Sequence, residues 1–350
     1  MAVGQGSLIS PLSYLGFGRE TTFGTGVTAT AGLNVISASL KTSKETKILE
    51  TIETSRTFSK RIGLSKAVEG EVEFYVDAKN NAFAYMMENA FGGAITVATA
   101  TGETAGGLAF SHTFNIGTIT DHSYTALSIN MRKGDSIGGM IFEYTGARVN
   151  EFTFTSEIDE ALKCSASMII KNSTKTSNDI SAAITGRQTD CLSFVNGRLS
   201  IETTFAALTS TSFWHVQSVE FGISNSLKGD TESRRIGSDV LDVLPPGMAT
   251  INLSFTMRFD TTTAYDAMLA ETQLSAQLQF QGNTLTGSVI KEGLLLNFPV
   301  IYINEAGDPE IGGPDEVLTA EISCTVLRDV SSAAGYALNA VLTNLVATYA

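Results

Sequence analysis

The chain has 350 residues, a hydrophobic fraction of 43% and a formal net charge of −13 at pH 7, with a pI near 4.7. This length predicts about two domains, each large enough for a hydrophobic core of its own. The negative charge and the lack of a Lys/Arg block exclude tight nucleic-acid binding, which depends on cationic contacts to phosphate. Three widely spaced cysteines without CxxC spacing argue against a disulfide framework and a zinc site, and favour folding in the cytoplasm.

The N-terminal segment is rich in Gly and Thr, with Tyr14, Phe17 and Phe23 as isolated aromatic side chains. We interpret residues 1–32 as an arm that packs on its own domain or on another subunit, because it cannot form a core alone. Met1–Ser10 lacks the basic and apolar regions of a secretory signal. No stretch approaches the roughly 18 apolar residues of a membrane-spanning helix, so we expect no membrane partner.

The next segment alternates apolar and polar residues, which predicts a strand over Leu33–Leu49. Glu50–Lys66 is long and polar, and such a loop in a compact domain is usually functional or interfacial. A second strand is predicted over Glu69–Ala78, and a short helix over Phe83–Ala90. The core face of the second strand carries Val72, Phe74 and Val76. The opposite face, which we expect to be wet, carries Glu71, Glu73 and Tyr75.

Further alternating runs follow the helix. They cover Phe110–Phe114, Tyr124–Met131, Gly139–Tyr144, Arg148–Thr155 and Leu162–Ile170. Turn-forming residues separate them, among them Thr145–Gly146 and Glu157–Glu160, so the pattern predicts an antiparallel meander. The alternation then stops in a region rich in Ser, Thr and Asn. We interpret residues 173–190 as a linker, which ends a first domain at residues 33–172.

The second half repeats the order of the first. Phe221 and Ile223 take the places of Leu40 and Thr42, Ser254–Phe259 alternates as Glu71–Val76 does, Asp260 replaces Asp77, and Tyr265–Ala270 forms the helix. A polar excursion over Asn225–Gly247 corresponds to Glu50–Lys66. Shared order and spacing indicate two copies of one unit, and the second copy makes a domain of residues 191–350.

The second meander is predicted from four more apolar runs. These are Ser275–Gln281, Leu285–Ile290, Leu294–Ile303 and Leu318–Leu327. A last run, Ala337–Ala347, is compatible with either a helix or a strand.

Catalytic chemistry has little support in this sequence. Only three histidines, His112, His122 and His215, are available for a metal cluster or for His-based catalysis, and no nucleophile elbow, HExxH helix, Walker loop or dinucleotide-binding loop is present. Carboxylates on strand faces and in turns are usually solvated rather than catalytic. We therefore expect no enzyme activity, no cofactor and no metal site.

Several segments together resemble a known family. Tyr14–Thr25, with the sequence YLGFGRETTFGT, is similar to the start of major tail tube proteins from long-tailed phages of the siphophage type, with Phe23 in place of the usual Tyr. The similarity continues at Val68–Phe74, Phe142–Asn150 and Leu342–Asn344, and so spans most of the chain.

This resemblance implies a mainly β fold with two tandem β-sandwich domains, each with a flanking short helix. Inner strands of neighbouring subunits would close into one barrel, and about four strands from each of six domains would give roughly 24 strands around an aqueous channel. It further implies rings that stack into a tail tube through which DNA leaves the virion. Single-domain relatives form hexamers, so a duplicated chain is expected to form a trimeric pseudo-hexamer.

The resemblance also implies partners and a location. The tape measure, tail terminator and distal tail proteins would contact the tube, which would be assembled in the host cytoplasm and reside in the virion tail. DNA would pass through without specific binding, because an acidic lumen repels phosphate. The alternatives are a host-surface binding module, such as a tail tip or adhesin domain, and a hydrolase on a jelly-roll-like sandwich.

Two sets of residues are candidates for these roles. The residues expected to face the lumen are Glu71, Glu73, Tyr75, Ser254, Thr256 and Arg258. Those expected in inter-ring loops are Glu53, Arg56, Arg61, Glu232, Arg234, Arg235, Asp239 and Asp242.

Overall fold

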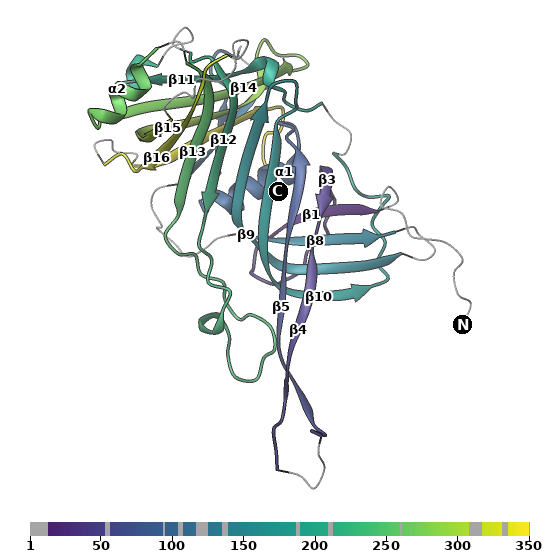
Figure 1. Ribbon diagram of the computed structural model, residues 1–350. Coiled ribbons are helices and arrows are strands. Elements are labelled where there is room, and N and C mark those ends of the chain that lie inside the picture. Colours follow the sequence, from purple (N-terminus) through teal and green to yellow (C-terminus); the bar gives the residue numbers. More distant parts are fainter. Residues whose placement is uncertain are drawn as a thin grey trace.

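The computed structural model describes residues 13–52, 57–93, 95–103, 108–116, 125–134, 139–186, 190–208, 213–259, 261–307, 317–330 and 335–349 (Figure 1). Glu53, Arg56 and Asp260, which carry predictions, lie outside these ranges. The fold is mainly β, as expected, and the strand ladders between named strands are antiparallel.

The described residues of the first half form ten strands and one helix. They are β1 (Tyr14–Glu20), β2 (Ala31–Gly32), β3 (Asn34–Ala38), β4 (Lys41–Ile48), β5 (Arg61–Tyr75), α1 (Asn81–Phe91), β6 (Thr96–Thr99), β7 (Phe110–Ile116), β8 (Ala126–Lys133), β9 (Met140–Glu157) and β10 (Lys163–Thr176).

The part of the second half that the structure describes forms the remaining elements, including three short 3₁₀ turns. They are η2 (Phe194–Asn196), β11 (Gly197–Glu202), η3 (Phe205–Ala207), β12 (Val216–Ser224), η4 (Thr231–Ser233), β13 (Thr250–Arg258), α2 (Thr263–Leu269), β14 (Leu274–Thr284), β15 (Lys291–Ala306), β16 (Thr319–Leu327) and β17 (Leu338–Asn344).

One continuous sheet, here named the long sheet, crosses both halves of the chain. Its order is β3 and β4, then β5, β10, β9, β12, β13, β16 and β15. The halves meet where β9 pairs with β12, from Glu151 opposite Ser224 to Glu157 opposite Ser218. The sheet is open: β3 and β4 form one edge, and the end of β15 forms the other. Among the described residues, the strands of one chain therefore do not close into a barrel.

The remaining strands continue from the long sheet and cover its core. The first part of β9 pairs with β8, which pairs with β1. In the second half, β15 also pairs with β14 and β17, and β17 pairs with β7 from the first half. The N-terminal arm thus packs on its own chain over Tyr14–Glu20, where Phe17 is fully buried.

Two β-bulges with the same sequence occur at equivalent places. In β9, the pairing with β10 skips Asn150, between Val149 opposite Met168 and Glu151 opposite Ser167. In β15, the pairing with β16 skips Asn304, between Ile303 and Glu305. An extra residue in one strand bends that strand and increases its twist. Each bulge therefore bends a long strand at an Asn-Glu pair.

Helix α1 lies inside the core, whereas the sequence predicted a flanking helix. Every residue from Ala82 to Phe91 is buried, and the helix contacts β1, β2, β7, β8 and β9. Two of these buried residues are polar and have partners: Glu88 pairs with Arg19 of β1 at 2.6 Å, and the Asn89 side chain accepts a hydrogen bond from the Val149 amide at 2.6 Å. The Asn80 side chain caps its first turn by accepting hydrogen bonds from the Ala82 and Phe83 amides, and Gly92 ends it with φ of 72°.

A chain of aromatic rings crosses the boundary between the halves. Phe83 of α1 contacts Phe154 of β9 edge to face at 6.1 Å between ring centroids. Phe154 stacks on Phe221 of β12 at 5.2 Å, and Phe221 contacts Phe298 of β15 at 5.5 Å. All four belong to one hydrophobic cluster. The two halves therefore share a core instead of forming two separate ones.

The structure corrects several predicted boundaries. Thr145–Gly146 is a bulge inside β9 and not a turn, because Gly146 adopts φ of 68° while pairing continues on both sides. Arg61–Lys66, predicted as loop, belongs to β5 and pairs with β4. Leu285–Ile290, predicted as a strand, is a turn between β14 and β15. β10 extends to Thr176, into the predicted linker, and the undecided C-terminal run forms β17.

Candidate functional site: a polar sheet face and a projecting hairpin

The six predicted lumen residues lie on one face of the long sheet. Glu71, Glu73 and Tyr75 alternate along β5 with the fully buried Val72 and Phe74. On β13, buried and outward side chains alternate in the same way, and the outward ones include Ser254, Thr256 and Arg258. Because β10, β9 and β12 separate β5 from β13, the two trios do not touch.

The strands between them complete a surface that we name the polar face. Besides the six predicted residues it contains Ser165, Ser167, Thr153, Thr155, Glu157, Ser218, Glu220, Glu321 and Ser323. A hollow of about 360 Å³ on this surface is lined by residues of β9, β12, β13, β15 and β16, including Ser254 and Thr256. Sequence reasoning missed these additional residues, although the same two-residue alternation marks them.

Hydroxyl groups hold the carboxylates of β5 in place. Ser165 on β10 donates a hydrogen bond to Glu71, and Ser37 on β3 donates to Glu73 at 3.3 Å. Cations are sparse on this surface. Lys163 pairs with Glu160, and that hydrogen bond raises the pKa of Lys163. The polar face is therefore a sheet of hydroxyls with an excess of carboxylates.

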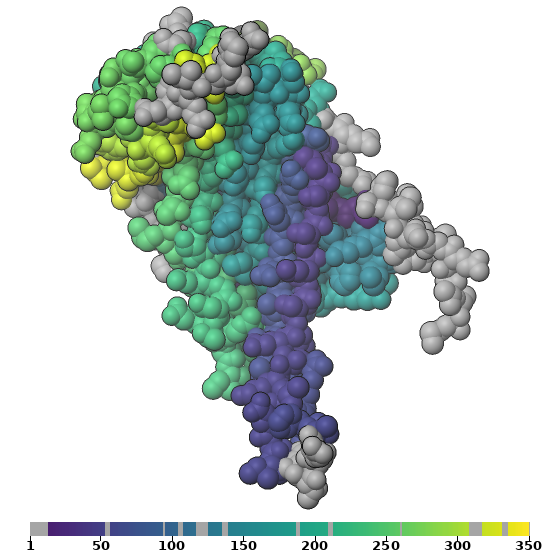
Figure 2. All heavy atoms as spheres, viewed as in Figure 1, coloured from purple at the N-terminus to yellow at the C-terminus, as the bar shows by residue number. Residues whose placement is uncertain are grey.

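A long hairpin projects from the body of the protein. It consists of β4 and the first residues of β5, and it extends as a narrow arm (Figures 1 and 2). Apolar side chains near its tip are open to solvent: Ile52 is 107% exposed and Phe58 is 59% exposed. Ile48 and Ile62 are also largely exposed, and Arg61 lies among them. Exposed apolar groups gathered at one projection indicate a contact surface.

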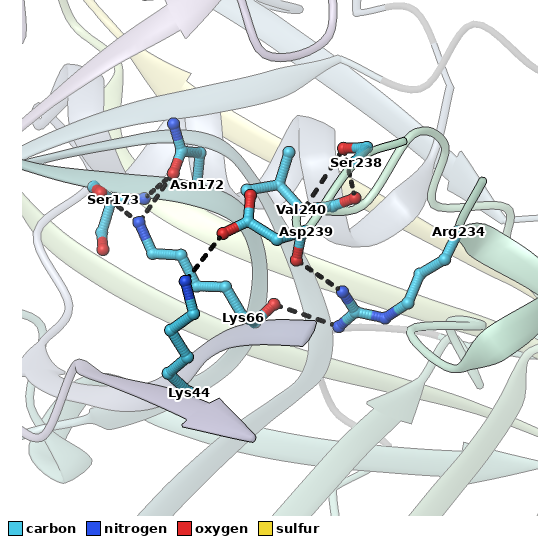
Figure 3. Close-up of polar contacts among 8 residues, drawn as sticks. All are labelled: Lys44, Lys66, Asn172, Ser173, Arg234, Ser238, Asp239 and Val240. Carbon is cyan, nitrogen blue, oxygen red and sulfur yellow. Dashed lines mark hydrogen bonds and ion pairs between the residues drawn. The ribbon is translucent and has the colours of Figure 1, made fainter. Parts of the chain in front are cut away.

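The Asn225–Gly247 loop braces the base of this hairpin (Figure 3). The amide of Lys66 in β5 donates to the Asp239 carbonyl at 2.7 Å, and the Arg234 guanidinium donates to the Lys66 carbonyl at 3.1 Å. The Lys44 ammonium in β4 lies 3.3 Å from the Asp239 carboxylate. Through these contacts, the loop from the second half of the chain pairs with the β5 backbone at Lys66.

The Lys66 side chain is anchored on β10. Its ammonium donates to the side chain of Asn172 at 2.8 Å and to the carbonyl of Ser173 (Figure 3). Burial lowers the pKa of Lys66, and the Asp239 carboxylate offsets part of that shift. The hairpin is thus fixed at its base by contacts from the Asn225–Gly247 loop and from β10.

The predicted inter-ring residues fall into two groups. Arg234 and Asp239 contact the hairpin base, and Arg235 pairs with Asp242 at 3.3 Å, so these four have partners within one chain. Arg61 and Glu232 are exposed. Glu53 and Arg56 lie outside the described residues.

The described residues contain no metal-binding cluster, and burial raises the pKa of each of their three cysteines. No group of three or more His, Cys, Asp or Glu side chains could hold a metal ion there. The buried His112 is engaged by Asn344 and by the Val346 carbonyl, at 3.2 and 2.7 Å, and burial lowers its pKa. Burial also raises the pKa of Cys324 to about 12, which disfavours a reactive thiolate. No helix in the described ranges is long and apolar enough to cross a membrane.

Comparison with known proteins gives the family. None of the curated proteins matches this sequence. A family model described as phage tail tube protein matches residues 11–326, which is most of the chain and includes the polar face and the hairpin. The chain therefore belongs to the phage tail tube protein family, whose members are structural proteins of the virion tail.

Proposed function

We propose that three copies of this chain form a ring with pseudo-six-fold symmetry, and that rings stack into a tube that conducts DNA. The observation that carries this proposal is the long sheet. It runs through both halves, ends in two open edges, and has a buried apolar face and a polar face. Closure of such sheets into a barrel removes the open edges and encloses the polar face.

Parallels between the two halves of the chain support the trimer. The bulges at Asn150 and Asn304 have the same sequence and the same place relative to their neighbouring strands. Strand β5 lies between β3 and β10, as β13 lies between β12 and β16. Each half therefore supplies four strand positions to the long sheet, and three chains would supply the roughly 24 of a barrel with an aqueous channel.

The polar face would line the channel. Its hydroxyls interact weakly with a passing polyanion, and its carboxylates repel phosphate, so DNA slides without being held. Glu71, Glu73, Tyr75, Ser254, Thr256 and Arg258 would all face the DNA path.

The projecting hairpin would join one ring to the next. Its Ile52 and Phe58 are exposed in their own chain, and insertion into the neighbouring ring would bury them. The Asn225–Gly247 loop would act mainly as a brace, with Glu232 and Arg61 free to meet the next ring. The tape measure, terminator and distal tail proteins would contact the finished tube after assembly in the host cytoplasm.

Mass measurement on isolated rings and negative-stain microscopy test this proposal. The expected particles are tubes, and rings with the mass of three chains. Stable six-chain rings would contradict the trimer, and protein that remains monomeric at every concentration and salt condition would contradict the tube function.

A further inference from the structure

We propose that a second copy of this chain binds along the two open edges of the long sheet in one defined register, the register of the internal β9–β12 junction. The edge formed by β3 and β4 of one copy pairs with the end of β15 of the other. This inference rests on the proposed ring and specifies its seam. The internal junction serves as the template, because it joins two equivalent units side by side.

The end of β15 corresponds to the end of β9. Glu305 is opposite Ser323 just after the bulge at Asn304, as Glu151 is opposite Ser167 just after the bulge at Asn150. Ala306 and Gly307 therefore take the places of Phe152 and Thr153. In β9 these residues pair with β12. In β15 the same edge carries no strand within the described residues.

The other open edge corresponds to β12. Ala38 is opposite Val72 on β5, and Val219 is opposite Phe255 at the matching position of β13. Further along, Thr42 is opposite Val68 as Ile223 is opposite Ile251. Thr42, Ser43 and Lys44 thus take the places of Ile223, Ser224 and Asn225.

The register of the β9–β12 junction, applied to the two open edges, gives the residue pairs expected between two copies. Ile223 is opposite Phe152, and Ser224 is opposite Glu151. The equivalent pairs between two copies are Thr42 with Ala306, and Ser43 with Glu305. The Asn225 amide donates to the Asn150 carbonyl at 2.8 Å, so the Lys44 amide is expected to donate to the Asn304 carbonyl of the second copy.

The backbone groups at both edges point in the required directions. The Gly307 amide donates to Glu321 of β16 at 2.8 Å, so the alternation of a strand turns the Ala306 amide to the open edge. There it lies 3.2 Å from the sulfur of Met268 in α2, and a thioether is a weak acceptor. The Ser39 amide donates to the Glu71 carbonyl of β5 at 2.8 Å. Because backbone groups alternate in direction along a strand, the amide and carbonyl of Thr42 point away from β5, to the open edge of the sheet. In the seam, the Ala306 amide donates to the Thr42 carbonyl of the second copy in place of the Met268 sulfur.

Disulfide cross-linking tests this register. Ser43 and Glu305 are exposed on the polar face and form a non-hydrogen-bonded pair, in which the Cα atoms are about 4.5 Å apart. That separation suits a disulfide, so Ser43→Cys with Glu305→Cys should link neighbouring chains in assembled tubes. Cys191→Ser removes the half-buried native thiol from every variant; the other two native thiols are buried.

Two matched controls define the result. Lys41→Cys with Glu305→Cys keeps the same face but shifts the pairing by two residues, to a separation of about 7–8 Å, and should cross-link roughly tenfold less. Ser224→Cys with Glu151→Cys, the internal template pair, should form a disulfide within a monomer. On a non-reducing denaturing gel the seam variant should give a ladder that ends at three chains.

The outcomes separate the seam from the tube function. Tubes visible by microscopy without the Ser43–Glu305 link, or with preferential linking of the shifted pair, would overturn the register and leave the tube function standing. Unsubstituted protein that forms neither rings nor tubes would overturn the proposed function and the seam together.

Discussion

The hairpin tip allows the sharpest test of ring stacking. The change is Ile52→Ser combined with Phe58→Ser. Ile52 is 107% exposed and Phe58 is 59% exposed, so neither substitution removes much packing within the chain. Surface substitutions away from packed features usually change the free energy of unfolding by less than about 0.5 kcal/mol. The variant should therefore fold with unchanged stability in urea.

The effect on stacking should be large. Burial of a fully exposed Ile or Phe side chain contributes about 1.5–3 kcal/mol, and Phe58 has somewhat more than half of its surface left to bury. Each hairpin would thus lose about 3 kcal/mol, and three hairpins in a trimeric ring about 9 kcal/mol. Since each 1.4 kcal/mol is a factor of ten, the protein concentration needed for stacking would rise by roughly 10⁶-fold. Even a third of this energy would raise that concentration about a hundredfold.

Sedimentation velocity and negative-stain microscopy over a concentration series measure this change. Ile52→Val with Phe58→Leu is the matched control, which keeps the tip apolar and should still form tubes. Tubes from the serine variant at the concentration needed by the unsubstituted protein would refute the assignment of the tip as the ring contact.

Three other predictions concern the polar face and the core. Glu71→Lys with Glu73→Lys should weaken stability by only about 1–2 kcal/mol, because it removes two exposed hydrogen bonds. If the two introduced lysines of each chain hold about two phosphates, retention of DNA in the tube should drop roughly tenfold between 50 and 200 mM salt. Genome ejection that is the same as from unsubstituted particles at low salt would exclude these residues from the DNA path. Phe154→Ala should cost about 3–5 kcal/mol in urea unfolding, and a loss below about 1 kcal/mol would show that the halves do not depend on a shared core. Burial lowers the pKa of His112 from its ordinary 6.5, so the unfolded chain binds that proton at higher pH and stability should fall as the pH drops below 6.5. His112→Gln should lose part of this dependence and exposed His215→Gln should retain it; equal pH profiles would contradict a buried, neutral His112.

Local patterns were sufficient to identify most elements and their faces. Strand alternation depends on neighbouring residues alone, so Val72 and Phe74 could be assigned to the core and Glu71 and Glu73 to the wet face. The helix near Phe83 was also predictable, because its apolar run, together with Asn80 before it and Gly92 after it, is local information.

Boundaries that depend on partner strands were predicted less well. A Gly with positive φ serves a turn as well as a bulge. Only the pairing of β9 with β8 and β10, which resumes on either side of Gly146, distinguishes the two there. Arg61–Lys66 lacks a core face, so its alternation is weak. It forms a strand because β4 pairs with it, and because Asp239 extends the ladder at Lys66.

The union of the halves could not be predicted from the sequence. The order of residues indicated two similar units, but no local signal states that β9 pairs with β12, or that β17 crosses to β7. Those pairings join residues far apart in the chain, and their register follows from the packing of Phe154 on Phe221 and from the bulge at Asn150. Alternation thus decided which side chains are wet, whereas non-local strand pairing decided that the wet side chains form one continuous face with two open edges.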